Sequence, residues 1–211
     1  MDKPVVIFGA GDLGRAALEI FESNSVITYC FLDDDSSLHN TEIDNVSVMG
    51  STDDDSILSV LGKKTEAFIA LDDNRIRKKL VETLKEDRKV VPVNAIHSTA
   101  QISQSASIGH GNFINNRVVI GSGAEMGSHC LLNSGAVIDH NCKLGDLVQV
   151  GAGSVLGSGV QVADEAFIGT GAVIVPGIKI GKNSRIGAGS VVVEHVEDNQ
   201  TVFGNPAMPV K

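Results

Sequence analysis

An aliphatic side chain, with methionine once, recurs at every sixth position from Ile96 to Val192, without a miss or an insertion. Such a run is very improbable by chance, and it constrains the fold more than any other feature of the chain. Glycine often follows the aliphatic residue, and alanine, serine or cysteine usually stands two positions before it. The members of the run are Ile96, Ile102, Ile108, Ile114, Ile120, Met126, Leu132, Ile138, Leu144, Val150, Leu156, Val162, Ile168, Ile174, Ile180, Ile186 and Val192.

A hexapeptide period is typical of a parallel β-helix, in which every six residues form one short strand and a corner. Three hexapeptides make a triangular coil of eighteen residues, with the aliphatic side chain inside and the small residue at the corner. The coils stack at the usual strand spacing of about 4.8 Å. Residues 96–200 are therefore predicted to form about five coils, followed by a C-terminal tail, residues 201–211. Cys130 and Cys142 stand at small-residue positions, so we interpret both as packing residues.

Residues 1–95 follow a different pattern, in which predicted strands alternate with predicted helices. This alternation favours a parallel α/β sheet, and the segment is long enough for one βαβαβ half of a dinucleotide-binding fold. Asp73 or Asn74 is suited to cap the second helix. The predicted strands are 5–9, 26–34 and 66–71, and the predicted helices are 13–24 and 74–88.

The sequence GAGDLG, residues 9–14, joins the first predicted strand to the first helix. Gly9 permits a tight turn, Gly11 lets the backbone approach a phosphate, and Gly14 allows the helix to pack closely. Asp33 and Asp34 end the second strand, where an acid that binds a ribose is expected. By itself the motif allows three readings: a dinucleotide such as NAD, a turn without a ligand, or a nucleotide-sugar.

His140 is a histidine that the repeat does not require. Residues eighteen apart stack on one another, so His140 is predicted to lie between Ser122 and Ser158, with glycines beside it. Open space beside an imidazole suits a general base, whereas the competing reading is a surface histidine on a corner. A metal site would need stacked histidines, but His110, His129 and His140 are 19, 11 and 30 residues apart. We therefore predict no metal.

The bulk composition excludes several classes of partner. The formal net charge is −9, and an acidic surface repels nucleic acid and anionic lipid. No apolar run approaches the roughly 20 residues that span a bilayer. The N-terminal residues lack a signal-peptide pattern, and the three cysteines form no disulfide framework. We therefore expect a cytoplasmic protein that binds neither nucleic acid nor membrane.

Several motifs together resemble one family. They are FGAGDLG, FLDD, FIALDDNRIRKKL, VNAIHSTAQIS, LNSGAVIDHNCKLGD and VFGNPA, and they extend over nearly the whole chain. The chain is similar to the bacterial sugar acetyltransferases typified by PglD and NeuD, which are hexapeptide-repeat acyltransferases. The resemblance implies that the β-helix is left-handed. It also implies an enzyme that uses acetyl-CoA as donor and a nucleotide-linked amino-sugar as acceptor.

The resemblance also implies the roles of individual residues. His140 matches the general base, which acts in direct acetyl transfer without an acyl-enzyme. Acetyl-CoA is expected between the subunits of a homotrimer, and the nucleotide-sugar in the N-terminal domain. The positions implied for the cofactor groove are Gln149, Thr170 and Ala188. Those implied for the nucleotide-sugar are Gly11, Asp12, Leu13, Asp33, Asp34 and Asp72.

The chain departs from the family pattern next to the base. Asn141 stands where an acid often follows the histidine, Gln149 replaces a second histidine, and Asp72 replaces a glycine. An asparagine can orient the imidazole but cannot stabilise its protonated form as a carboxylate does; Asp139 and Asp146 are the nearby carboxylates. We expect N-acetylation of a 4-amino-sugar, because a weaker base favours an amine. The alternatives are sugar O-acetylation and a non-catalytic, nucleotide-binding trimeric scaffold.

Overall fold

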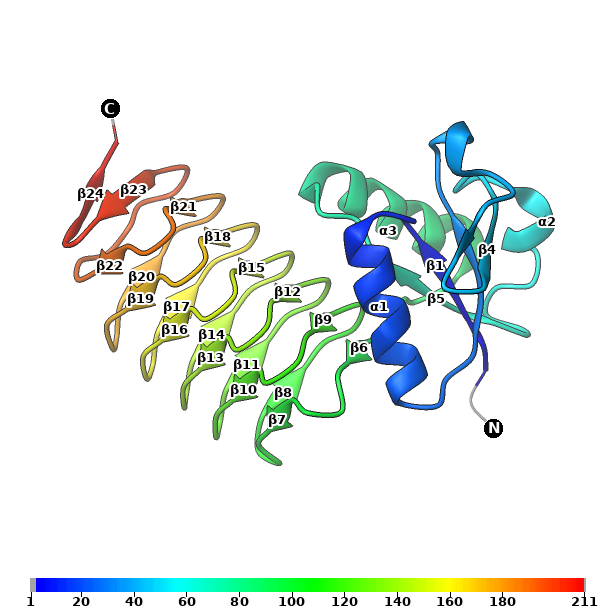
Figure 1. Cartoon of the computed structure of the whole chain (residues 1–211). Helices are drawn as coiled ribbons and strands as arrows, with labels where there is room; N and C mark the ends of the chain where they lie inside the picture. The colour runs from blue at the N-terminus through cyan, green and yellow to red at the C-terminus, as the bar shows by residue number, and fades with distance from the viewer. Residues whose placement is uncertain (1–2, 211) are drawn as a thin grey trace. The chain divides into compact units, whose positions relative to one another are not determined.

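The computed structural model describes residues 3–210 and divides into two compact units, Met1–Ser98 and Thr99–Lys211. The first unit is an α/β domain and the second is a β-helix (Figure 1). The elements of the first unit are β1 (Val5–Phe8), α1 (Asp12–Ser23), β2 (Thr28–Leu32), η1 (Ser36–Leu38), β3 (Glu42–Ile43), β4 (Val46–Gly50), α2 (Asp55–Leu58), β5 (Glu66–Ile69), α3 (Asn74–Arg88) and β6 (Ala95–Ile96).

The sheet of the first unit has the strand order β3-β4-β2-β1-β5. Strands β4, β2, β1 and β5 run parallel, and β3 pairs antiparallel at the edge. Strand side chains alternate between two faces. Phe68 on one face contacts Phe21 of α1, with ring centroids 5.6 Å apart, while the other face packs with α2 and α3 around Leu32, Ile69 and Leu84. The domain is therefore a three-layer α/β unit.

Two details of this unit differ from the sequence prediction, and a third decides between two residues that the sequence offered as a helix cap. The hairpin β3–β4 was not expected, and it adds a parallel strand beside β2 without an α-helix between β2 and β4, since only the short 3-10 turn η1 and β3 lie there. Strands β2 and β5 are shorter than the apolar runs that contain them. Asp73 is the N-cap of α3, because its carboxylate accepts hydrogen bonds from the backbone N–H groups of Arg75 and Ile76, at 2.8 and 3.3 Å.

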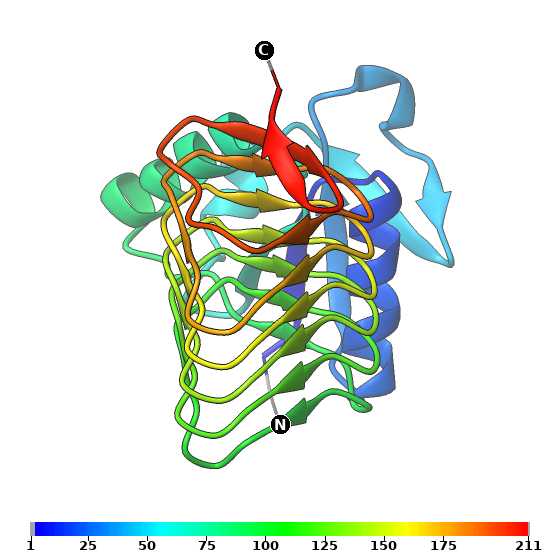
Figure 2. The ribbon, with the colours of Figure 1, turned by 90° about the vertical axis from the view of Figure 1, so that its left-hand side faces the viewer.

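The second unit is a left-handed parallel β-helix whose strands are mostly two residues long (Figure 2). Strand partners lie eighteen residues apart, as in the pair Ile120 and Ile138, so the predicted coil length is correct. The strands are β7 (Gln101–Ile102), β8 (Ser107–Ile108), β9 (Phe113–Ile114), β10 (Val119–Ile120), β11 (Glu125–Met126), β12 (Leu131–Leu132), β13 (Val137–Ile138), β14 (Lys143–Leu144), β15 (Gln149–Val150), β16 (Val155–Leu156), β17 (Gln161–Val162), β18 (Phe167–Ile168), β19 (Val173–Ile174), β20 (Lys179–Ile180), β21 (Arg185–Ile186), β22 (Val191–Val192), β23 (Thr201–Gly204) and β24 (Ala207–Pro209).

These strands form three faces. The first face has the order β22-β19-β16-β13-β10-β7, the second has β20-β17-β14-β11-β8, and the third runs from β24 through β23, β21, β18, β15 and β12 to β9. The last coil is shorter, since Arg185 pairs with Thr201, and β23 then folds back on β24. The segment 201–211 thus includes an antiparallel hairpin.

A residue with positive φ stands at every sixth position, one at each corner from 111 to 189. This conformation costs little for glycine and is tolerated by asparagine, because other side chains crowd the carbonyl. Eight of the fourteen are glycine and two are asparagine. The set is Gly111, Arg117, Gly123, His129, Gly135, Asn141, Leu147, Gly153, Gly159, Glu165, Gly171, Gly177, Asn183 and Gly189.

The core of the β-helix should respond to the loss of a single aliphatic side chain. Ile168 is fully buried, so Ile168→Ala should lower the free energy of unfolding by about 2–5 kcal/mol, because the rigid coil cannot collapse around the cavity. The outward-facing Gln161→Ala variant serves as the control and should stay within about 0.5 kcal/mol. Urea unfolding at a fixed protein concentration measures both. Equal stability of the two variants would contradict the inward assignment.

Candidate active site

His140 lies on the corner that follows β13, and Asp139 holds it in place. Asp139 Oδ1 accepts the His140 backbone N–H at 2.7 Å and lies 2.9 Å from His140 Nδ1. The imidazole remains exposed, with 55% of the side chain accessible. The acid that orients the histidine therefore precedes it in the chain, and the residue that follows it has another role.

This contact determines which ring nitrogen is available. An ionised carboxylate only accepts hydrogen bonds, so Nδ1 must carry the proton that points at Asp139. Nε2 then has a free lone pair and can accept a proton. A carboxylate behind Nδ1 also stabilises the imidazolium that forms when Nε2 is protonated. The pair Asp139–His140 thus has the arrangement of an oriented general base.

The charge on Asp139 persists well into the acidic range. Its pKa is lowered below the usual value by hydrogen bonds from the His140 backbone N–H and then from the imidazole. A carboxyl group whose pKa is lowered by folding stabilises the fold above its unfolded pKa, and this contribution is lost as the pH falls through the folded pKa. The orienting contact is therefore complete at neutral pH.

Asn141 occupies a corner position where the backbone has φ of 57°. Its N–H donates to Ser122 O at 2.9 Å, and its side-chain oxygen lies over Gly123. In the described part of the chain, the Asn141 side chain forms no hydrogen bond with the imidazole. Backbone conformation thus accounts for asparagine here. Asp146, the other nearby acid, accepts the Ser128 N–H at 2.7 Å and belongs to a different corner.

The surroundings of His140 are small, as the count by eighteen predicts. Ser122 and Ser158 lie below and above it, and the Gly159 N–H donates to His140 O at 3.0 Å. A Cβ placed on Gly159 or Gly177 would meet no atom within 4 Å. Open space therefore continues beside the imidazole along this corner column, which we name the His140 edge.

The residues expected to bind the cofactor lie on another edge of the β-helix. Thr170 and Ala188 stack one coil apart, at the corners that lead from the third face into the first, and Gln149 lies on β15 of the third face. We name this column the glycine edge, because a Cβ on any of its four positive-φ glycines would meet no atom within 4 Å. Those glycines are Gly135, Gly153, Gly171 and Gly189. Such an edge has room for an extended ligand.

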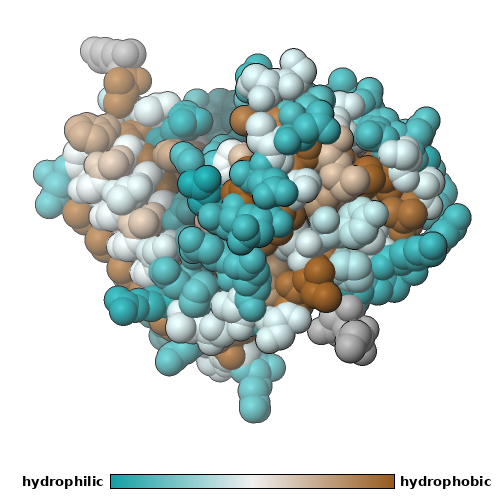
Figure 3. Space-filling model, turned by 45° about the vertical axis from the view of Figure 1, so that its right-hand side comes forward, coloured by the Kyte–Doolittle hydropathy of each residue, from teal (hydrophilic) through white to brown (hydrophobic). Residues whose placement is uncertain are grey.

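The first face lies between these two edges and is apolar. The outward residue of five successive strands is valine, and Val119, Val155 and Val173 are 36–38% exposed. The third edge, which does not border this face, carries bulky residues at its positive-φ positions, including His129, Leu147 and Glu165. Hydrophobic side chains recur along the coils in the space-filling view (Figure 3). We name the first face the valine face; the two open edges are those that flank it.

The glycine-rich loop of the first unit has the geometry that its sequence predicts. Gly9 has φ of 110°, and a Cβ on Gly14 would lie 2.1 Å from Gly9 O, so both positions require glycine. Gly11 is the N-cap of α1, without a side-chain cap, and a Cβ there would meet nothing within 4 Å. Asp12 begins α1 and is exposed, whereas the Leu13 side chain is buried. Leu13 lies in the first turn of the helix, so it would contact a ligand through its backbone N–H. This helix start suits an anion.

Three of the four carboxylate oxygens of Asp33 and Asp34 already accept hydrogen bonds from other residues of the domain. Asp33 Oδ2 accepts the Ala10 N–H of the glycine-rich loop at 2.7 Å, and its Oδ1 accepts the Asp35 N–H. Asp34 Oδ1 accepts the backbone N–H and hydroxyl of Thr52, at 2.9 and 2.8 Å. Asp72 follows β5 and is exposed, and its carbonyl accepts a hydrogen bond from the buried Arg77. Asp33 thus positions the loop, while Asp34 keeps a second oxygen available.

Two further findings concern the described residues 3–210. Within this range no three histidine, cysteine or acidic side chains are grouped as metal ligands would be. No helix in the same range has the length and apolar character needed to cross a membrane.

The stacked hexapeptides and the oriented histidine on an open edge define a hexapeptide-repeat acyltransferase. The model of the bacterial transferase hexapeptide (six repeats) matches residues 123–158 and 159–194, and that of the PglD N-terminal domain matches residues 4–84. The chain belongs to the PglD-type sugar acetyltransferases of the left-handed β-helix superfamily.

Solved structures resemble the chain over its whole length. PerB from Caulobacter crescentus, in complex with CoA and GDP-perosamine, is 32% identical, with 99% of this chain and 97% of PerB covered and a TM-score of 0.90. The acetyltransferase domain of PglB from Neisseria gonorrhoeae, in complex with acetyl coenzyme A, is 28% identical, with full coverage of both chains and a TM-score of 0.91. WeeI from Acinetobacter baumannii is 25% identical, with 98% and 99% covered and a TM-score of 0.88. No curated protein matches the chain.

Sequence reasoning missed two features of the site. It left Asp139 as one of two nearby acids, because only side-chain geometry shows which one reaches His140. It also missed the valine face and the open glycine edge, although the period carries their signal. Reading positions eighteen apart would have collected the five valines into one column and the four glycines into another.

Substitutions of the two residues that flank His140 should differ in their effect on the turnover rate. Asp139→Asn removes the charge that stabilises protonated imidazole, so the turnover rate should fall about 10- to 100-fold, which corresponds to one charge-assisted hydrogen bond. Asn141→Gly keeps the positive-φ corner, so the rate should stay within about twofold. Steady-state acetyltransferase kinetics measure both. If Asn141→Gly loses activity and Asp139→Asn keeps it, the assignment is reversed.

Proposed function

We propose that this enzyme transfers the acetyl group of acetyl-CoA to the 4-amino group of a nucleotide-linked sugar, with His140 as general base. The observation that carries the proposal is the Asp139–His140 contact on an open edge, which leaves Nε2 free. Family membership sets the reaction class, and PerB, a GDP-perosamine N-acetyltransferase, supports an amine acceptor.

The reaction needs one proton transfer and one acyl transfer. The neutral amine attacks the thioester carbonyl while His140 Nε2 accepts a proton from the nitrogen. The carbon–sulfur bond breaks, and the CoA thiolate leaves. The protonated imidazole, stabilised by Asp139, then supplies the proton that converts the thiolate into the free thiol. Direct transfer of this kind requires no acyl-enzyme, and the buried Cys130 and Cys142 are not suited to form one.

The argument from Asn141 for an amine acceptor is wrong. Asn141 suggested a base without an acid partner, which would favour an amine over a hydroxyl, but Asp139 supplies that acid. The residue next to the histidine therefore no longer distinguishes an amine acceptor from a hydroxyl acceptor. N-acetylation now rests on the similarity to PerB.

We further propose that the enzyme is a homotrimer with its active sites between subunits. In one copy the His140 edge and the glycine edge, with Gln149, Thr170 and Ala188 on or beside it, lie on opposite sides of the valine face. If three valine faces pack around a three-fold axis, the His140 edge of one copy meets the glycine edge of the next. Burying the valines provides the driving force. The three cysteines are buried and form no disulfide, which fits a reducing compartment, and we place the enzyme in the cytoplasm.

The assignment of the base can be tested with acceptor panels. CoA release is followed with UDP-, dTDP- and GDP-linked 4-amino-sugars, and His140→Ala should lower the rate on the best acceptor about 10²- to 10⁴-fold. The variant should still bind CoA and nucleotide-sugar, because the imidazole removes a proton and holds neither ligand. His110→Ala, on the edge that does not border the valine face, is the control. Full activity of His140→Ala would refute the assigned base.

A melting-temperature measurement, together with the CoA-release assay, distinguishes an enzyme from a scaffold. A ligand of the native state raises the melting temperature, so millimolar acetyl-CoA should stabilise the enzyme. No stabilisation, together with no turnover on any acceptor, would favour the non-catalytic alternative.

The trimer can be tested with a charge on the valine face. Val173→Asp places a carboxylate on a face that assembly buries, so light scattering after size-exclusion chromatography should show the mass of a single chain, and acetyl transfer should be lost. Gln161→Asp, on another face, should keep the trimer. A Val173→Asp variant with unchanged mass and activity would rule out this face as the interface.

A further inference from the structure

A cavity of about 830 Å³ lies in the first unit, between α3 and the loop that joins β4 to α2. Its size is within the range of about 300–1,000 Å³ that small-molecule sites occupy. Among the residues expected to bind the nucleotide-sugar, only Asp34 lines it. The ligand of the cavity therefore has to be inferred from the cavity's own lining and not from the glycine-rich loop.

The cavity lies at the edge of the sheet where ligands of open α/β folds bind. Asp34 follows β2, Ser51 and Thr52 follow β4, and Leu71 follows β5. These positions are the carboxyl ends of parallel strands, and the glycine-rich loop with Gly11 follows the carboxyl end of β1 in the same sheet. Ligands of such sheets bind outside these strand ends. One ligand can thus place an anionic group at α1 and another part in the cavity.

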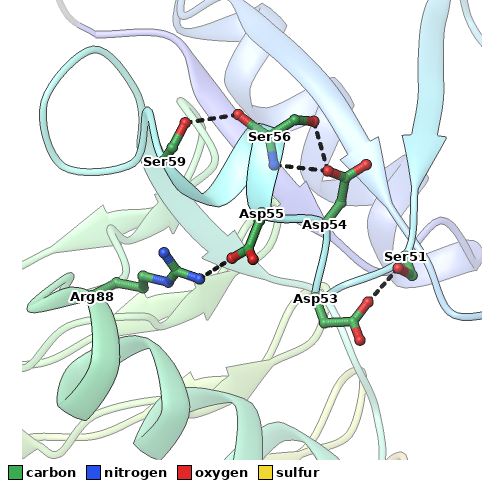
Figure 4. Close-up of polar contacts among 7 residues, drawn as sticks. All are labelled: Ser51, Asp53, Asp54, Asp55, Ser56, Ser59 and Arg88. Carbon is green, nitrogen blue, oxygen red and sulfur yellow. Dashed lines mark hydrogen bonds and ion pairs between the residues drawn. The ribbon is translucent and has the colours of Figure 1, made fainter.

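The lining of the cavity is suited to a neutral ring with hydrogen-bond donors. Its apolar part consists of leucines and one isoleucine: Leu58, Leu71, Ile76, Leu80 and Leu84. Four carboxylates and two cations line it as well, and one cation, Arg88, is bonded to Asp55 (Figure 4). The excess of negative charge disfavours a phosphate inside the cavity.

Two of these carboxylates are neighbours. Asp34 is held by Thr52, and Asp53 is the next residue, bonded to the Ser51 hydroxyl. Figure 4 shows Asp53 turned toward Ser51 while Asp55 reaches Arg88. Within the described residues, Asp34 Oδ2 and Asp53 Oδ2 accept no hydrogen bond. The wall therefore presents two adjacent acceptor sites, as a ribose and its attached base would require.

We infer that this cavity binds guanosine, so that the acceptor is a GDP-linked amino-sugar. The inference rests on the proposed function and specifies its substrate. Asp34 accepts the ribose hydroxyls, and Asp53 accepts the adjacent N1–H and N2–H groups of guanine. A carboxylate offers two acceptor oxygens, which match this pair of donors.

The same carboxylate disfavours the other bases. Uracil and thymine present one N–H between two carbonyl oxygens, and these oxygens repel a carboxylate. Adenine and cytosine place an acceptor nitrogen beside the amino group. A polar site that one ligand satisfies rejects analogues that leave its groups unpaired. PerB, which is similar over the whole chain, was solved with GDP-perosamine.

The test is a direct binding measurement on the full chain, without acetyl transfer. Isothermal titration with GDP, UDP, dTDP and ADP should show GDP at least tenfold tighter than the other three. Asp53→Asn should reduce this preference at least tenfold, chiefly through weaker GDP binding. Glu19→Gln, an exposed change on α1, is the matched control and should leave the preference unchanged.

Two results would overturn the inference: UDP, dTDP or ADP binding as tightly as GDP, or an unchanged preference in a folded Asp53→Asn variant. Failure of the proposed function would look different. A chain that prefers GDP but acetylates no amino-sugar retains the guanosine site and loses the assigned reaction. A chain that acetylates UDP-linked sugars fastest, and prefers UDP in titration, retains the reaction and loses this inference.

Discussion

Close stacking of backbone on backbone at the corners of the coil is the constraint on which the β-helix depends. A Cβ on Gly121 would lie 2.7 Å from the backbone nitrogen of His140, and one on Gly151 would lie 2.4 Å from that of Thr170. These glycines allow successive coils to meet at the strand spacing. The positive-φ residue two positions later completes the turn into the next face. Corner sterics therefore fix which positions must be small and which can vary.

The residues at the positive-φ positions differ among the three edges of the β-helix. Two edges carry glycine with open space beside it, whereas the third carries His129, Leu147 and Glu165 in the same strained conformation. Positive φ costs such residues free energy, so their presence shows that the fold does not need glycine there. The glycines of the open edges are consequently best explained by the space they leave. Independently of His140, this difference shows which edges leave space for a ligand.

The period predicted the β-helix almost completely, because every aliphatic position of the run from Ile114 to Val192 is buried, a role that tertiary context does not change. The first unit was predicted less completely. Its hairpin turns at Asp44 and Asn45, both with positive φ, and an Asp-Asn pair between short β-forming segments is a recognisable two-residue turn signal. The cavity was not predictable, since its lining comes from segments as distant as Asp34 and Arg88, which only the folded sheet brings together.

One corner of the β-helix contains both the hydrogen bonds that join successive coils and the contact between Asp139 and His140. The corner turns at Asn141, whose N–H bonds to the coil below, while the His140 carbonyl accepts an N–H from the coil above. The backbone of His140 is thus held by the ladder, and Asp139 needs to fix only the side-chain torsions. An acid placed directly before the histidine can bond both its backbone N–H and its ring. Orientation of the His140 ring therefore needs no residue beyond the hexapeptide, which makes it compatible with an uninterrupted repeat.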